Sequence, residues 1–110
     1  MILWKQYFQA MNNLGVAYSR WEQYDRSIFC YKQALKLEPS SINAIEALGL
    51  AYLETNRTGD AIKCFKRVIK LDPNHGSSLY YLANIYLTDK NWGKARRYLP
   101  KASHRLSKSH

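Results

Sequence analysis

The sequence predicts an all-α protein in which one antiparallel helix hairpin is repeated about three times. The main observation is a period of 34 residues, which relates Tyr18, Tyr52 and Tyr86. The second observation is local. Leu14 and Gly15 lie four and three residues before Tyr18, a spacing that places all three on one face of a helix. A glycine on that face allows a second helix to approach closely, which favours a tightly packed hairpin.

Longer stretches repeat with the same period and show where the helices end. The nine residues 31–39, YKQALKLEP, align with residues 65–73, FKRVIKLDP. Each stretch finishes on a proline, Pro39 or Pro73, which cannot continue a helix and so predicts a turn into the next repeat. The alignment therefore predicts the second helix of each hairpin and its C-terminal end.

The predicted helices follow one another with short connections. Asp25 and Asp60 lie near the starts of two of them, where a carboxylate complements the helix dipole. Small residues recur at one position of the second helices, opposite the glycine-bearing face: Ser27, Ala61 and Ala95. From these signals we expect six helices, over residues 8–21, 24–38, 42–55, 58–71, 76–89 and 92–99.

These positions resemble the pattern of the tetratricopeptide repeat (TPR) family, W-x2-L-G-x2-Y, A-x3-F, P. The first copy has Met11, Leu14, Gly15, Tyr18, Ser27, Tyr31 and Pro39. The second copy has Ile45, Leu48, Gly49, Tyr52, Ala61, Phe65 and Pro73. The third copy has Leu79, Leu82, Ala83, Tyr86, Ala95 and Leu99, with Ser107 in place of the proline. The resemblance implies a right-handed superhelical stack of antiparallel helix hairpins, a TPR solenoid.

The repeats divide the chain into five segments. An apolar N-terminal extension, 1–7, is either the remnant of a preceding repeat or the start of the first helix. Repeats one and two cover 8–41 and 42–75. Repeat three, 76–102, has a degenerate second helix because Pro100 falls inside it. A basic, flexible tail is expected over 103–110.

The resemblance also implies a binding site, because the first helices of TPR hairpins line a concave groove that receives a peptide or a partner helix. The residues transferred to that groove are Asn13, Val16, Arg20, Glu46, Leu50, Leu53, Glu54, Tyr80, Tyr81, Asn84 and Leu87. Their mixture of apolar and amide side chains predicts a ligand with apolar anchors, extended or helical. The alternative is that Leu50, Leu53 and Leu87 pack between adjacent repeats.

One TPR subclass grips the C-terminal carboxylate of heat-shock chaperones with, in order, lysine and asparagine on the first repeat, asparagine on the second, and lysine and arginine on the third. The matching positions of this sequence hold Asn12, Val16, Ala47, Ser77 and Tyr81. None of them fits that clamp. We therefore expect a protein-binding groove of another specificity.

The C-terminal end is strongly basic. Seven of the 17 cations, and none of the eight acids, lie between Lys90 and the end of the chain. Six of these cations form a candidate basic patch: Lys94, Arg96, Arg97, Lys101, Arg105 and Lys108. With Trp92 and Tyr98 among them they could contact a nucleic acid, which makes an accessory nucleic-acid-binding module the rival function. An acidic protein surface and a merely solubilising end remain alternatives.

Other classes of function find little support in the sequence. No nucleophile–base pair, phosphate loop or metal-ligand motif is present, so we expect no enzyme, no cofactor and no metal site. Cys30 and Cys64 are too few for a disulfide framework, and no apolar run is long enough for a membrane span. A scaffold or adaptor in the cytoplasm or nucleus is the expectation. Exposed repeat ends also predict that copies could dimerise.

Overall fold

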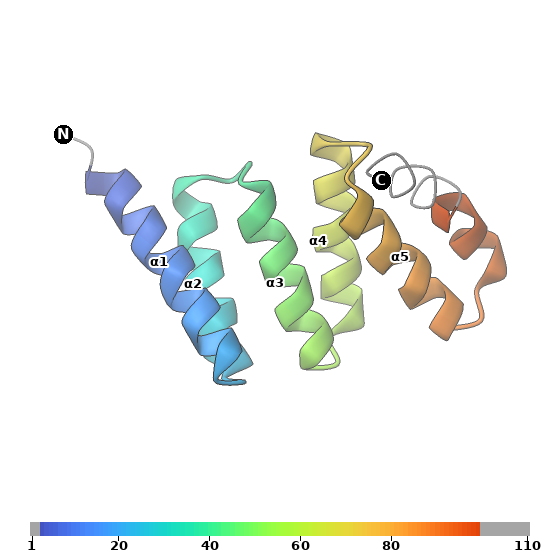
Figure 1. Ribbon diagram of the computed structural model, residues 1–110, viewed down its shortest axis with the longest axis horizontal. Helices are drawn as coiled ribbons and strands as arrows, with labels where there is room; N and C mark the ends of the chain where they lie inside the picture. The colour runs from blue at the N-terminus through green and yellow to red at the C-terminus, as the bar shows by residue number, and fades with distance from the viewer. Residues whose placement is uncertain (1–2, 100–110) are drawn as a thin grey trace, which may run out of the picture. The chain divides into compact units, whose positions relative to one another are not determined.

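The computed structural model describes residues 3–99, and every regular element in that range is a helix (Figure 1). The helices are α1 Leu3–Arg20, α2 Tyr24–Leu37, α3 Ile42–Glu54, α4 Thr58–Leu71 and α5 Gly76–Thr88, followed by a helical segment over 92–99. The predicted all-α fold is confirmed. The helix ends agree with the expected ones within two residues, except at the N-terminus. Pro100 and the expected tail, 103–110, lie outside the described residues.

Helix α1 begins five residues before the expected start at residue 8. Leu3, Trp4 and Tyr7 belong to its first two turns, and their side chains are exposed. The repeat pattern misses this extension because it begins only at Met11, the first motif position of repeat one. Apolar residues upstream of a repeat pattern fit either the end of a preceding helix or the start of the next one.

The chain divides into two compact units, residues 1–64 and 65–110. In the first unit α1 packs along α2, and α2 packs against α3 (Figure 1). The small motif residue at the start of each second helix is buried, as the sequence predicts for Ser27, Ala61 and Ala95. Asp25 and Asp60 lie in the first turns of α2 and α4, and the Asp60 carboxylate is 3.5 Å from Arg57 Nε.

The contact between α1 and α2 is closest at Gly15. A Cβ atom built on Gly15 would lie 2.6 Å from Cε1 of Tyr31, well inside van der Waals contact. Only 2% of Tyr31 is exposed, so the ring has little room to move aside. Close packing therefore explains a glycine in the middle of a helix, as the sequence predicts.

The first helix of each hairpin is followed by a residue in the left-handed backbone conformation. These three residues are spaced by the 34-residue period. Glu22, Asn56 and Lys90 have φ values of 60°, 61° and 58°. The amide of the following residue donates to the carbonyl of the motif tyrosine, at 2.8 Å in all three copies. This arrangement is the Schellman motif, which pairs otherwise unsatisfied carbonyls at a helix C-terminus.

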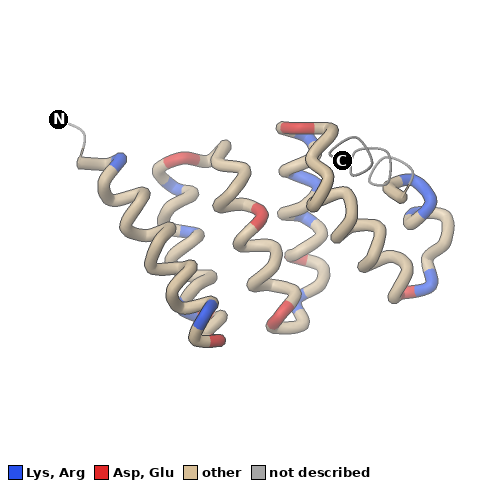
Figure 2. Tube along the Cα trace, in the orientation of Figure 1, with Lys and Arg blue, Asp and Glu red and all other residues tan. Residues whose placement is uncertain are grey.

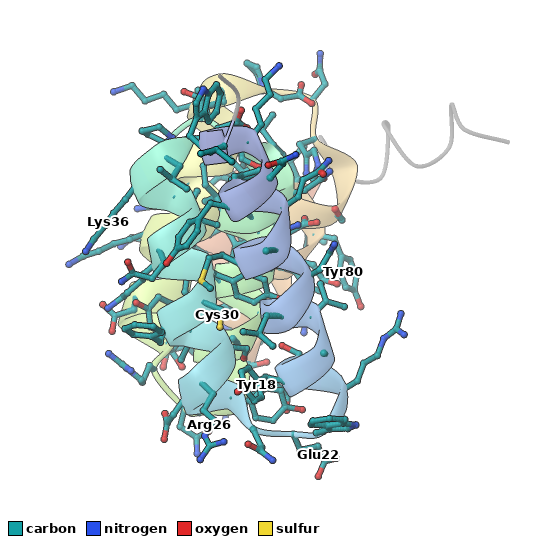
Figure 3. The ribbon with its side chains drawn as sticks, turned by 90° about the vertical axis from the view of Figure 1, so that its left-hand side faces the viewer. Tyr18, Glu22, Arg26, Cys30, Lys36 and Tyr80 are labelled. Carbon is teal, nitrogen blue, oxygen red and sulfur yellow. The ribbon has the colours of Figure 1, made fainter. Side chains whose placement is uncertain are left out.

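A cation lies over the motif tyrosine at each of these turns. The Arg26 guanidinium is 5.7 Å from the Tyr18 ring centroid, and Lys94 Nζ is 5.5 Å from that of Tyr86. In repeat two the position of Arg26 is taken by Asp60, and Arg57 covers Tyr52 at 4.8 Å instead. Figure 3 labels Tyr18, Glu22 and Arg26 beside the turn between α1 and α2.

The cysteines, the candidate metal ligands and the length of the helices bear on which functions are open to the protein. Cys30 and Cys64 are both buried, and burial raises the pKa of the Cys30 thiol. Within residues 3–99, no three histidine, cysteine or acidic side chains come together as a metal-binding group. Over the same range, no helix has the length and apolarity that crossing a membrane would require.

Candidate functional site

A pocket of about 330 Å³ lies in the first unit, on the side of α1 and α3 that the sequence assigns to the groove. Helix α2 closes part of it with two tyrosines. Its lining consists of Val16, Ser19, Arg20, Tyr24, Tyr31, Ala47, Leu50, Ala51 and Glu54. Four of these are predicted groove residues: Val16, Arg20, Leu50 and Glu54. The structure thus brings together one part of the predicted set.

A second pocket, of about 320 Å³, shares Val16 and Arg20 with the first. Asn13, Ala17 and Trp21 complete its lining, so a fifth predicted residue, Asn13, joins the same side of α1. Because the two pockets share these residues, they adjoin each other on α1. We call the first of them, lined by α1, α2 and α3, the α1–α3 pocket.

The floor of the α1–α3 pocket is apolar, and small side chains create its space. Ser19, Ala47 and Ala51 leave room between the two helices, while Val16 and Leu50 remain partly accessible. Tyr31 reaches this floor because Gly15 has no side chain in its way. A hydrogen bond between the hydroxyl groups of Ser19 and Tyr31 ties the floor to α1.

Opposite charges stand at the rim. Arg20 and Glu54 are both exposed and both line the pocket. Neither makes an ion pair within the described part of the chain, where the pair found is Arg57–Asp60. Two unlike charges that do not neutralise each other leave the rim with a dipole.

Two phenols of the pocket hold their protons more strongly than usual. Burial raises the pKa of Tyr24, and the carboxylates of Glu54 and Glu22 raise it further. Burial also raises the pKa of Tyr31, although the hydrogen bond with Ser19 lowers it and Cys30 adds a smaller increase. Both side chains therefore remain neutral at physiological pH, where they can donate a hydrogen bond.

The remaining groove residues of α3 and α5 do not line the α1–α3 pocket. Glu46 and Leu53, on α3, are half-buried and do not line the pocket. On α5, Asn84 is exposed and Leu87 is half-buried. The α1–α3 pocket therefore includes four of the eleven predicted residues, and the adjoining pocket adds Asn13.

The two adjacent tyrosines of α5 differ in role. Tyr81 stacks on the fully buried Phe65, with ring centroids 5.2 Å apart, so this side chain stabilises the second unit. Tyr80 meets Tyr81 edge-on at 5.8 Å and remains exposed; it is labelled in Figure 3. Of the pair, Tyr80 is the more exposed side chain.

The described half of the candidate basic patch lies on the segment 92–99. Lys94, Arg96 and Arg97 are exposed, as is Trp92. Tyr98 is half-buried because it stacks on Tyr86 with centroids 6.0 Å apart, so its ring is already engaged. Lys101, Arg105 and Lys108 lie outside the described residues.

Seven lining residues are not among the eleven predicted groove residues: Ala17, Ser19, Trp21, Tyr24, Tyr31, Ala47 and Ala51. One signal could have found Tyr31. Its equivalent in repeat two is Phe65, so repeat one alone places a hydroxyl group at this buried aromatic position. No comparable signal exists for Tyr24, which reaches the pocket from the first turn of α2.

Comparisons with known proteins agree with the repeat architecture. Among solved structures, MamA superposes with a TM-score of 0.88 at 22% identity, covering 93% of this chain and 60% of its own. The CopN–Scc3 complex gives a TM-score of 0.83 at 16% identity, with 89% and 58% covered. This chain therefore spans about three-fifths of the length of these neighbours, and the likeness concerns the fold.

Two further comparisons concern the sequence itself. No curated protein matches the chain. The family model described as anaphase-promoting complex, cyclosome, subunit 3 matches residues 20–105, which include most of all three repeats. The chain therefore belongs to this family of TPR-type repeats.

Proposed function

We propose that this chain is a non-catalytic adaptor that binds a segment of a partner protein in the α1–α3 pocket. The observation that carries the proposal is the pocket itself, an apolar depression with unlike charges at its rim, built on the helices whose inner face TPR proteins use for binding. Volumes of about 300–1,000 Å³ are typical of sites that bury a compact ligand. The α1–α3 pocket is therefore suited to one or two side chains of a peptide or helix.

Two comparisons support a role in an assembly. The family description names a subunit of a multiprotein complex, and one structural neighbour was solved as a complex of two proteins. Exposed Tyr80 on α5 is proposed as a separate point of contact in the second unit. The proposal needs neither a cofactor nor a reaction.

The test compares two variants in which aspartate replaces an exposed apolar residue, one inside the pocket and one outside it. Val16, 37% exposed, lines the pocket, whereas Phe29, 60% exposed on α2, lines neither depression. Immobilised Val16→Asp and Phe29→Asp proteins are compared with the parent chain in affinity capture from a cell extract, read by quantitative mass spectrometry. We expect Val16→Asp to lose at least tenfold of the specific partner signal, because an aspartate buried against an apolar ligand loses its hydration.

The control, Phe29→Asp, should retain the partner, and circular dichroism should show both variants folded. If Val16→Asp captures the same proteins in the same amounts as the parent, the pocket is not the binding site. Loss of signal in both variants would point to an effect of added negative charge and would also contradict the proposal.

The rival function, binding of nucleic acid, rests on Lys94, Arg96 and Arg97 beside exposed Trp92. Its test is titration of a random oligonucleotide at several salt concentrations. Micromolar binding that weakens steeply with salt and disappears in Arg96→Glu/Arg97→Glu, but survives Val16→Asp, would favour the rival. Absence of binding at low salt would remove it.

A further inference from the structure

The charges at the rim of the α1–α3 pocket occupy equivalent positions of successive repeats. Arg20 and Glu54 are 34 residues apart, as are Val16 and Leu50 one turn earlier. All four side chains line the same depression. The pocket therefore has two layers, an apolar layer of Val16 and Leu50 and a charged layer with a cation on α1 and an anion on α3.

The two charges of this layer have no ion-pair partner among the described residues. Within residues 3–99 neither Arg20 nor Glu54 takes part in an ion pair, although they stand on helices of the same compact unit. The equivalent residue of repeat three is the neutral Thr88, so the pattern of unlike charges is confined to the first two repeats. A ligand bound across α1 and α3 would meet a positive charge on one side and a negative charge on the other.

From this geometry we infer that the pocket selects a partner segment with an aliphatic anchor flanked by an acidic and a basic residue. This inference rests on the proposed function and names its ligand class. The anchor enters the apolar layer, the acidic side chain faces Arg20, and the basic side chain faces Glu54. The neutral phenol of Tyr24, whose pKa Glu54 helps to raise, adds a hydrogen-bond donor beside Glu54.

The charge selectivity proposed for this pocket differs from the selectivity that the net charge of the protein predicts. With a net charge of +9, the protein as a whole attracts acidic ligands of any kind. Glu54 opposes a uniformly acidic segment at this site, and Arg20 opposes a uniformly basic one. Like charges brought together across an interface are a common source of specificity.

The experiment is selection from a displayed library of random twelve-residue peptides against the full chain and three variants. Glu54→Arg makes both rim charges positive, and Arg20→Glu makes both negative. Lys36→Glu, on α2 and outside both pockets, is the control for a charge reversal of the same size (Figure 3). The readout is the enrichment of each charge pattern around an aliphatic residue, followed by dissociation constants of the selected peptides.

For the parent chain and Lys36→Glu we expect enrichment of peptides with one acid and one base flanking the anchor. Selection on Glu54→Arg should shift to two acids, and selection on Arg20→Glu to two bases. Each reversal should weaken binding of the original peptides about fivefold, since an exposed charge contact contributes up to about 1 kcal/mol and a fivefold change corresponds to that amount. The effect should shrink as salt is added.

The outcomes distinguish the two proposals. If selected peptides lose binding in Val16→Asp but show the same charge pattern on all rim variants, the pocket binds segments and the charge rule is wrong. If the selected peptides bind Val16→Asp as tightly as the parent chain, the proposed function fails as well. It also fails if no peptide is enriched over the starting library. A shift of pattern in Lys36→Glu would show a long-range charge effect and overturn the inference.

Discussion

Gly15 shows how a single absent side chain shapes both the hairpin and the pocket. Because no Cβ stands in its way, the Tyr31 ring crosses beneath α1 and reaches the pocket floor, where its hydroxyl meets that of Ser19. The resemblance to TPR repeats accounts for the glycine and the aromatic residue as packing partners. The hydroxyl group is an addition of repeat one, and its environment follows only from the packed structure.

We predict that Gly15→Ala destabilises the protein although alanine favours helices. The new methyl group would lie within 3 Å of three Tyr31 ring atoms, and such overpacking costs about 1–3 kcal/mol, against a gain of about 1 kcal/mol in helix propensity. Gly59→Ala is the matched control, because nothing lies within 4 Å of its built Cβ. Urea unfolding should show a lower midpoint for Gly15→Ala only. Equal midpoints would mean that Tyr31 moves aside freely.

Tyr31 also predicts a loss of stability in alkali. Burial raises its pKa above the ordinary value of 10.0, so above pH 10 the unfolded chain releases this proton more readily than the folded one. The free energy of unfolding should therefore fall as pH rises from 10 through the folded-state pKa. Tyr31→Phe should make this decline shallower, while losing about 1 kcal/mol near neutral pH with the hydrogen bond to Ser19. Parallel pH profiles of urea midpoints for the two proteins would contradict this assignment.

At the scale of the element, the three hairpins share one way of ending their first helix. Glu22, Asn56 and Lys90 adopt a left-handed conformation that glycine accepts without strain and asparagine tolerates better than glutamate or lysine. The Schellman hydrogen bonds and the cation over the motif tyrosine recur at the same turns. The helix ends are thus determined by local geometry that three different residues satisfy.

We predict that glycine at two of these turns stabilises the protein. Glu22→Gly and Lys90→Gly should each raise the free energy of unfolding by about 0.5–1 kcal/mol, because the strain of a left-handed side chain is removed. Asn56→Gly should gain less. Lys66→Gly, in the middle of α4, should lower stability by about 1 kcal/mol. Melting temperatures that fall in all four variants would show that the turns are not strained.

At the scale of the whole molecule, α1 exposes a motif leucine that is buried at the equivalent positions of α3 and α5. Leu14 is 41% exposed, whereas the equivalent Leu48 and Leu82 are 6% and 0% exposed. Leu3, Tyr7 and Trp21 of the same helix and its C-terminal turn are exposed as well. The charges of α1 are Lys5 and Arg20, so in Figure 2 the helix is blue only near its ends. Dimerisation through repeat ends stays a prediction, and α1 is the surface on which to test it.

We expect the chain to self-associate through α1 and Leu14→Lys to weaken that association at least tenfold. Each copy would lose the burial of one leucine, which contributes about 1.5–3 kcal/mol, and two lysines would face each other. Leu71→Lys, which replaces an exposed leucine on α4, is the control. Sedimentation equilibrium measures the dissociation constants. A parent chain that is monomeric at all concentrations, or equal association in both variants, would contradict the prediction.

The sequence by itself determined the repeat, the helix hairpins and the family to which they belong, because a 34-residue period and helical spacing of motif residues are local patterns. The resemblance to TPR repeats also implied that Val16, Arg20, Leu50 and Glu54 belong to one groove face. The sequence could not separate Tyr80 from Tyr81, or show Tyr98 engaged with Tyr86, because stacking depends on which ring finds a partner.

Only the tertiary structure decided where a depression opens and how it is lined. The α1–α3 pocket exists because Ser19, Ala47 and Ala51 are small at the place where α1, α2 and α3 converge, and because Tyr31 passes Gly15 to close its floor. Empty space is a property of side chains from several helices at once. The exposure of Leu14 has the same origin, since a leucine is buried only where a neighbouring helix covers it.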